Sequence, residues 1–147
     1  MGVAALIDTN ILVYRFDPRF PERQRTATGL LRQGIAEGNL RIPHQAIIEF
    51  VAAVSRPLGS GGPLLAPADA YLEAEDLFNQ FEVLYPNESL VRLAIRGAAT
   101  YQLPWFDANI WACAEYYGLA ELISEDFQHD RLYGRVRAVN PFIKLHK

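Results

Sequence analysis

The stretch ALIDTNILVYRF, residues 5–16, is almost continuously apolar, yet the polar triplet DTN at residues 8–10 interrupts its middle. An unpaired charge in a buried segment is costly, so an acid such as Asp8 must end its element, have a partner or hold a cation. The run from Val3 to Ile7 has the length and composition of a buried strand, and residues 11–14 begin a helical spacing. Asp8 is therefore predicted to lie at a junction between a strand and a helix.

Beyond this junction the apolar pattern alternates between helix and strand. Helices are predicted over residues 21–38, 44–56, 67–80, 88–101 and 107–118. Short strands are predicted over residues 39–42, 81–85, 120–124 and 135–139. This order predicts an α/β fold, with a central parallel sheet of about five short strands and helices on both faces. The loop over residues 58–66 is too short to link two domains, so we expect residues 1–147 to form a single domain.

The composition is that of a globular protein, because half of the residues are hydrophobic and 21% are charged. Cys113 is the only cysteine, which rules out an internal disulfide and suits a reducing compartment. The N-terminus does not resemble a signal peptide, and no run approaches the ~20 apolar residues of a membrane span, so we expect a cytoplasmic protein without a membrane partner. The net charge of −3 argues against a strongly basic protein that coats nucleic acid, but it permits a local RNA-binding patch.

Four acidic residues occupy compatible positions in this predicted architecture. In parallel sheets functional groups collect at the carboxyl ends of the strands. Asp8 and Asp126 each follow a predicted strand, and Asp107 is predicted to be the N-cap of the helix over residues 107–118. Glu49 lies inside an apolar helix, where small residues on its own face leave space around the carboxylate.

Each acid taken singly also has a purely structural explanation. Asp107 could serve only as a helix cap, Asp8 and Asp126 could be loop residues satisfied by backbone N–H groups, and Glu49 could lie at the solvent boundary. Together, however, several carboxylates repel one another unless cations neutralise them. Mg²⁺ and Mn²⁺ prefer oxygen ligands, and such ions can lower the pKa of a water for phosphodiester hydrolysis. Asp8 is therefore predicted to be a metal ligand.

Four segments that carry these acids resemble the acidic motifs of the PIN-domain family. They are LIDTNILVY, PHQAIIEFVAAV, WFDANIWACAEYYG and LISEDFQHDRLYGRVRAVNPF. Their order and the chain length are similar to those of VapC-type toxin ribonucleases from prokaryotic toxin–antitoxin pairs. The resemblance implies a PIN-like fold and an endoribonuclease that depends on Mg²⁺ or Mn²⁺. It also implies a small VapB-like antitoxin whose tail covers the acidic site, and a homodimer.

By the same resemblance, a catalytic and metal-binding site is implied at four residues: Asp8, Glu49, Asp107 and Asp126. Thr9 and Asn10 would be supporting polar groups. Glu125 competes with Asp126, since adjacent residues leaving a strand point in different directions; the resemblance favours Asp126. Asp130 is either an outer acid or a turn residue, and His129 is interpreted as a surface or hydrogen-bonded residue outside catalysis.

Basic and aromatic residues near these motifs have open interpretations. The arginines that flank the first and last motifs could hold RNA phosphates or could be ordinary solvated surface; they are Arg15, Arg19, Arg131, Arg135 and Arg137. Trp105 and Phe106 could stack on a base, although a place in the core or an interface is the favoured interpretation.

Two other functions fit parts of the pattern. A PIN-like module that binds RNA without hydrolysing it would keep the fold, but the presence of all four acids weighs against it. A haloacid-dehalogenase-type phosphatase with Asp8 as nucleophile is a weaker alternative, because that family's motif resembles D-x-D-x-T and position 10 is Asn.

Overall fold

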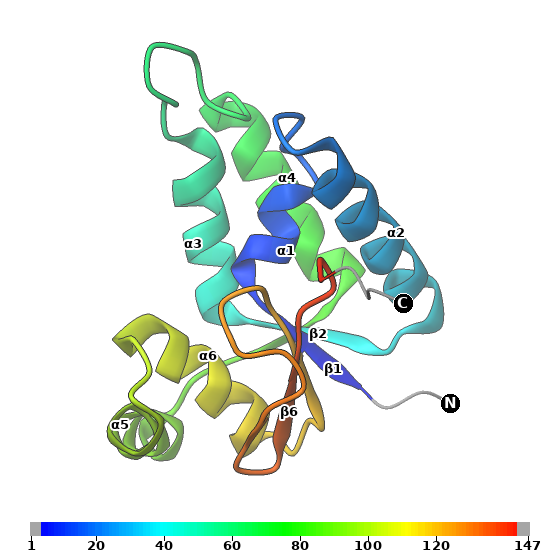
Figure 1. The fold of residues 1–147 in the computed structure, drawn as a ribbon. Coiled ribbons are helices and arrows are strands. Elements are labelled where there is room, and N and C mark those ends of the chain that lie inside the picture. The colour runs from blue at the N-terminus through cyan, green and yellow to red at the C-terminus, as the bar shows by residue number, and fades with distance from the viewer. Residues whose placement is uncertain (1–3, 144–147) are drawn as a thin grey trace.

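The computed structural model describes residues 4–143, and Val3, the predicted start of the first strand, lies outside them. The described chain alternates helices and strands (Figure 1). The helices are α1 (Thr9–Tyr14), α2 (Pro21–Glu37), α3 (His44–Ser55), α4 (Pro67–Gln80), α5 (Glu88–Tyr101) and α6 (Trp105–Tyr116). The strands are β1 (Ala5–Ile7), β2 (Leu40–Pro43), β3 (Glu82–Leu84), β4 (Glu121–Ile123), β5 (Leu132–Tyr133) and β6 (Val136–Val139).

The strands form one sheet in the order β3-β2-β1-β4-β6-β5. All neighbouring pairs are parallel except β5 and β6, which are antiparallel. The chain passes outward from β1 through β2 to β3, then crosses back to place β4 on the other side of β1. Strand order thus reverses between β1 and β4, and in open α/β sheets the crevice for ligands lies at the carboxyl ends of the strands at such a point.

Successive side chains of β1 pack alternately into two separate hydrophobic cores. Ala5 and Ile7 pack into one cluster, with residues of α1 to α4, whereas Leu6 packs into the other, with residues of α5 and α6. Because successive side chains of a strand point to opposite faces, a short apolar strand can serve both helical layers. Figure 1 shows the two layers on opposite sides of the sheet.

The predicted α/β fold with a parallel sheet and helices on both faces is confirmed, with one additional strand. The sheet includes β5, a two-residue strand that joins β6 through a turn in which Gly134 has φ 63°. A strand of two residues is too short to show an apolar period, and only its pairing with β6 defines it.

Within residues 4–143, no helix has both the length and the apolar character needed to cross a bilayer.

The prediction that Asp107 caps its helix is wrong. Helix α6 begins at Trp105, and the cap residue is Pro104, with extended ψ of 149° and no side-chain cap bond. Proline cannot continue a preceding helix, so a helix starts readily just after it. Asp107 is therefore the third residue of α6, where its carboxylate interacts favourably with the positive end of the helix dipole but does not cap the helix.

Candidate functional site

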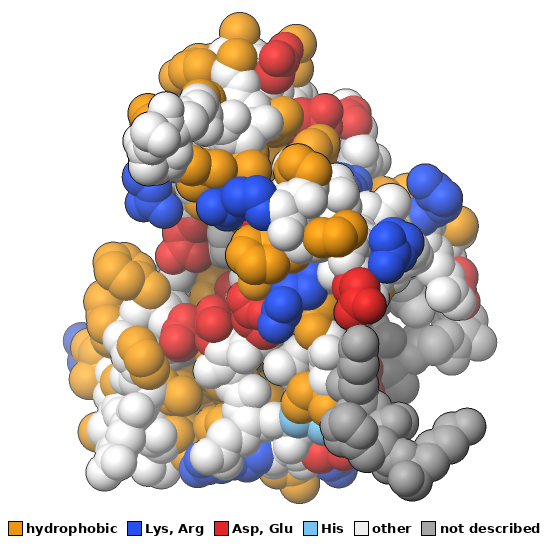
Figure 2. Space-filling model, turned by 45° about the horizontal axis from the view of Figure 1, so that its top comes forward, with side chains coloured by type: hydrophobic (Ala, Val, Ile, Leu, Met, Phe, Trp, Pro, Cys, Tyr) orange, Lys and Arg blue, Asp and Glu red, His pale blue; other side chains and the backbone are white. Residues whose placement is uncertain are grey.

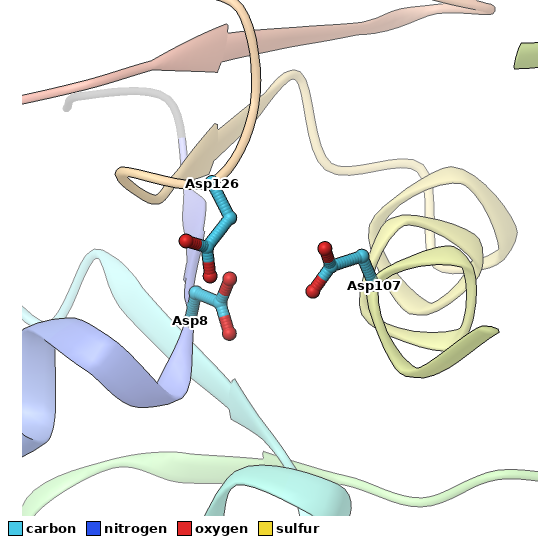
Figure 3. A group of neighbouring side chains, drawn as sticks. All are labelled: Asp8, Asp107 and Asp126. Atoms are coloured by element: carbon cyan, nitrogen blue, oxygen red, sulfur yellow. The ribbon is translucent and has the colours of Figure 1, made fainter. Parts of the chain in front are cut away.

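Three aspartates from distant parts of the chain meet at the carboxyl edge of the sheet (Figure 3). Asp8 follows β1, Asp126 lies in the loop after β4, and Asp107 lies in the first turn of α6. One carboxylate oxygen of each lies within 4.8 Å of the corresponding oxygens of the other two. Figure 3 shows all three side chains directed toward a common space. This group of three is called the aspartate cluster below.

Asp8 is the fixed member of the aspartate cluster. Its side chain is only 3% exposed. One carboxylate oxygen caps α1 by accepting a 2.6 Å hydrogen bond from the Thr9 backbone N–H. The other accepts a 2.6 Å hydrogen bond from the hydroxyl of Ser124, which is fully buried. Asp8 thus ends its strand and has partners, two of the three explanations that its sequence position allowed, and both partners hold its oxygens in place.

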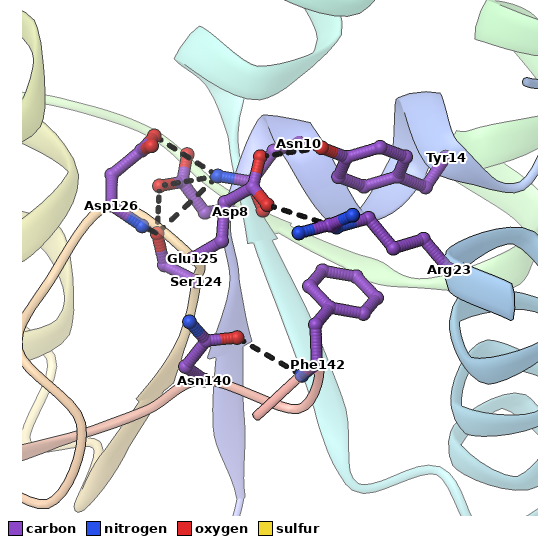
Figure 4. A network of polar contacts seen from close by, with 9 residues as sticks. All are labelled: Asp8, Asn10, Tyr14, Arg23, Ser124, Glu125, Asp126, Asn140 and Phe142. Carbon is purple, nitrogen blue, oxygen red and sulfur yellow. Dashed lines mark hydrogen bonds and ion pairs between the residues drawn. The ribbon is translucent and has the colours of Figure 1, made fainter. Parts of the chain in front are cut away.

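Asn10 links Asp8 to Asp126. Its amide nitrogen donates a 3.0 Å hydrogen bond to Asp126 and makes longer contacts with the Ser124 hydroxyl at 3.4 Å and Asp8 at 3.5 Å. The Asp126 backbone N–H also donates to the Ser124 hydroxyl at 3.0 Å. Figure 4 shows this network crossing from the start of α1 to the loop after β4. Asn10 therefore orients two carboxylates from opposite ends of the chain.

Glu49 lies beside the aspartate cluster but is not one of the residues that form it. Its half-buried carboxylate accepts a 2.6 Å hydrogen bond from the Thr9 hydroxyl and a 2.9 Å bond from the Gln45 amide. Gln45 also donates to the Phe106 carbonyl at 3.1 Å, which ties α3 to the first turn of α6. Glu49 is close enough for its charge to raise the pKa of Asp107.

Burial, and after it the proximity of the other acids, raises the pKa of two of these carboxyl groups. Burial is the main cause that raises the pKa of Asp8 to about 7, and the charges of Asp126 and Asp107 add to it against the two hydrogen bonds to Asp8. Burial also raises the pKa of Asp107 to about 6, together with the charges of Asp126 and Glu49. A cluster that resists full ionisation is one that a cation would stabilise.

Glu125 points away from the aspartate cluster and has different partners (Figure 4). Its carboxylate accepts a 2.8 Å hydrogen bond from the Tyr14 hydroxyl and lies 3.6 Å from the Arg23 guanidinium. Burial, together with the hydrogen bond and charge of Glu125, raises the pKa of Tyr14 to about 12, so the phenol stays protonated as a donor. Asp130 lies in a turn with φ 66° and is not in the cluster.

The arginines that were candidates for binding RNA are already engaged within the protein. Arg19 forms a two-bond fork with Asp17 at 2.8 and 2.9 Å, and Arg135 pairs with Glu115 at 2.9 Å. The other three have weaker or aromatic contacts: Arg15 donates to Gln80, Arg131 lies 4.5 Å from the Tyr133 ring centre, and Arg137 donates to the Asp130 carbonyl.

Trp105 and Phe106 are not core residues, since they are 46% and 67% exposed. They line an apolar cavity of about 350 Å³ between α3, α5 and α6. Gln45 and Glu49 line the same cavity, so it adjoins the acidic site. Their exposure leaves an interface or a stacking role open for the two aromatic side chains.

Sequence reasoning missed the part played by Ser124. The apolar pattern places Ser124 at the end of a predicted strand, and a small hydroxyl side chain directly before two acids is the signal in the sequence that points to its role. The roles of Tyr14 and Gln45 were also missed, because their partners Glu125 and Phe106 are distant in the sequence.

The sequence matches the PIN-domain family over residues 5–135. Among solved structures, a toxin–antitoxin complex from Klebsiella pneumoniae is 22% identical with a TM-score of 0.68, and the match covers 95% of this chain and 98% of that one. A DNA-bound VapBC complex from Salmonella typhimurium is 15% identical with a TM-score of 0.67, covering 93% and 97%. VapC20 from Mycobacterium tuberculosis, a sarcin–ricin-loop-cleaving toxin, is 13% identical with a TM-score of 0.61, covering 81% and 87%. No curated protein matches the chain.

The raised pKa of Asp8 makes stability depend on pH when cations are removed. The folded protein binds the Asp8 proton more tightly than the unfolded chain, so the free energy of unfolding should fall as pH rises from about 4 to about 7. The loss is at most ~4 kcal/mol, because each pKa unit corresponds to ~1.36 kcal/mol. Denaturant titrations in EDTA at pH 5 and pH 8 should show the part of this loss that lies above pH 5, about 3 kcal/mol at most, in the wild type and a smaller loss in Asp8→Asn, which keeps a good N-cap.

The exposed Asp130→Asn variant is the control and should follow the wild type. An Asp8→Asn protein with the same pH dependence as the wild type would show that the buried charge of Asp8 does not set it.

Proposed function

The chain belongs to the PIN-domain family, and from that premise we propose that it is a metal-dependent endoribonuclease, the toxin of a type II toxin–antitoxin pair. The observation that carries this proposal is the aspartate cluster at the point where strand order reverses, with Glu49 beside it. Its substrate would be RNA, and the reaction would be hydrolysis of a phosphodiester bond by an activated water.

The donor set fits a hard divalent cation such as Mg²⁺ or Mn²⁺. The ligands would be the carboxylates of Asp8, Asp107 and Asp126, with Glu49 as the fourth acid of the site. They offer only oxygen, and their mutual repulsion favours a cation among them. When bound, such an ion would neutralise the cluster, stabilise charge on the phosphate and lower the pKa of a water.

The protein's own side chains would orient the carboxylates. Ser124 and the Thr9 backbone hold Asp8, the Asn10 amide holds Asp126, and the Thr9 hydroxyl and Gln45 hold Glu49. Such preorganisation lets the site meet developing charge without rearranging. A side-chain nucleophile is not required, and the His129 ring accepts a 3.0 Å hydrogen bond from the Asn140 backbone, consistent with a structural role.

The toxin assignment is supported by the solved structures to which the chain is similar, several of which are toxin–antitoxin complexes. The partner we propose is a small VapB-like antitoxin whose tail covers the acidic site, and the active chain would be a homodimer in the cytoplasm. An arginine on such a tail would pair with the carboxylates, and an apolar side chain would fit the cavity beside Glu49.

The alternative function is a PIN-fold module that binds RNA without cleaving it. The closely grouped carboxylates weigh against it, because a surface that only binds RNA gains nothing from clustered negative charge. A phosphatase with Asp8 as nucleophile is set aside, since the family to which the chain belongs is a different one.

Purified protein should cleave RNA in Mg²⁺ or Mn²⁺ and lose this activity in EDTA. The Asp8→Asn and Asp107→Asn variants should lose at least ~100-fold in rate, because positioned charge of this kind contributes factors of that size. Gel analysis of labelled RNA gives the measurement. Asp130→Asn makes the same chemical change in the loop that carries Asp126 and should stay fully active. Cleavage that persists in EDTA or in the two site variants would overturn the mechanism.

Glu49→Gln should reduce cleavage severely at little cost in stability. Glutamine retains the shape of the side chain, and removing one charge lowers the repulsion that raises the pKa of Asp107. In this variant the cleavage rate should therefore fall while the melting temperature stays close to that of the wild type. Wild-type cleavage by Glu49→Gln would place the residue outside the chemistry.

Expression of the active chain alone should arrest growth, and a small protein encoded beside it should relieve the arrest. That protein should co-purify with this chain and block RNA cleavage in vitro. The Asp107→Asn variant is the control, because it should be harmless yet still bind the neighbour. If the active chain is harmless and binds no neighbouring product, the toxin assignment is wrong even where RNA cleavage is observed.

A further inference from the structure

A site lined by carboxylates must bind a polyanion if it acts on RNA, and a role for cationic side chains at its rim therefore rests on the proposed function. The aspartate cluster and Glu49 repel a phosphate backbone, so cationic side chains are needed at the rim to guide it in. Figure 2 shows acidic side chains gathered in a hollow of the surface, with Lys or Arg side chains beside them. An arginine at this rim can bind a phosphate only where its guanidinium N–H groups are not already held by hydrogen bonds within the protein.

Arg23 stands beside the site without a tight partner of its own. It lies in the first turn of α2, and its Nε is 3.6 Å from the Glu125 carboxylate, beyond hydrogen-bond distance. Glu125 directly precedes Asp126, so the Arg23 guanidinium is next to the loop that supplies one member of the aspartate cluster (Figure 4). By contrast, the Arg19 guanidinium is held by Asp17 in two bonds of 2.8 and 2.9 Å.

Three aromatic rings hold the Arg23 guanidinium in place. Its central carbon lies 5.7 Å from the ring centres of Tyr14 and Phe142 and 5.9 Å from that of Phe20. Tyr14 in turn packs edge-to-face on both phenylalanines and donates its hydroxyl to Glu125. Contact with ring faces steadies a guanidinium group without using the N–H donors at its edge.

The position of Arg23 relative to solvent suits binding of an external anion. Its side chain is 45% exposed, whereas that of Glu125 is 25% exposed. The planar guanidinium group matches the geometry of a phosphate, to which it can donate two parallel hydrogen bonds. A phosphate arriving from solvent would meet these donors at the edge of the acidic hollow.

We propose that Arg23 binds a backbone phosphate of single-stranded RNA next to the position cleaved, on the Asp126 side of the site. The rings of Tyr14, Phe20 and Phe142 hold the guanidinium in position before RNA binds. Glu125, which accepts the Tyr14 hydroxyl hydrogen bond, lies on the less exposed side of the guanidinium. The contact reads the backbone and not the base sequence. It contributes to binding of the substrate and takes no part in bond breaking.

Binding of a labelled, mixed-sequence, single-stranded RNA to the Asp107→Asn protein tests this assignment. Fluorescence anisotropy in Mg²⁺ over a series of salt concentrations gives the affinity and its salt dependence. Adding Arg23→Gln should weaken binding roughly tenfold, as expected for loss of a charge-assisted contact. The slope of log affinity against log salt should fall in magnitude by about 0.7, the value for one phosphate contact on a single strand.

Two further variants separate a phosphate contact from a structural role. Arg25→Gln makes the same change at an exposed position two residues along α2 and should leave affinity and slope near those of the parent. Arg23→Lys keeps the charge and should restore most of the salt slope, although it loses the planar fork. Melting temperatures of all variants should stay close together, whereas a residue that only ties α2 to the loop would lower stability and leave the slope unchanged.

The outcomes distinguish this inference from the proposed function. If RNA is cleaved but Arg23→Gln and Arg25→Gln bind it equally, the role of Arg23 is overturned and the ribonuclease stands. If binding depends on Arg23 but no condition gives cleavage by the wild type, the phosphate contact of Arg23 stands and the ribonuclease is overturned. Absence of any RNA binding by the parent protein overturns the inference.

Discussion

The hydrogen bond from the Ser124 hydroxyl to the Asp8 carboxylate is the contact on which the site depends. It joins the ends of β1 and β4, two adjacent strands that are far apart in the sequence. A buried carboxylate without partners would be too costly to keep, and this bond, with the Thr9 backbone N–H, makes its burial tolerable. The same hydroxyl accepts from the Asp126 backbone, so one serine fixes the spacing of two acids.

The topology of the sheet accounts for the rest of the arrangement. Because β1 lies between β2 and β4, the carboxyl end of β1 opens into a crevice with helices from both layers around it. Helix α3 brings Glu49 from one layer and α6 brings Asp107 from the other. The Gln45 contact with the Phe106 carbonyl joins these helices across the crevice. Acids supplied by four separate segments can therefore repel one another without opening the fold.

Much of this could be predicted from the sequence, and what could not has a common cause. Strong helical periodicity and Pro or Gly at the ends located the helices, and α2 does end at Gly38, which has φ 67°. The aspartates that form the cluster were all predicted as candidates, because the sequence pattern places each of them close to the end of a strand or the start of a helix. The features that escaped prediction are pairings: β5 with β6, Tyr14 with Glu125, and each arginine with its partner. Local patterns do not encode which distant residue a side chain will meet.

The two tryptophans of the chain occupy contrasting environments, and this gives the molecule an internal optical probe. Trp111 is buried, with 3% exposure, and its ring N–H donates to the Tyr133 carbonyl at 2.8 Å. Trp105 is half exposed at the mouth of the apolar cavity, on the same helical turn as Asp107. A soluble quencher reaches only the second indole, so any molecule that fills the cavity changes the emission of one tryptophan and leaves the other as an internal reference.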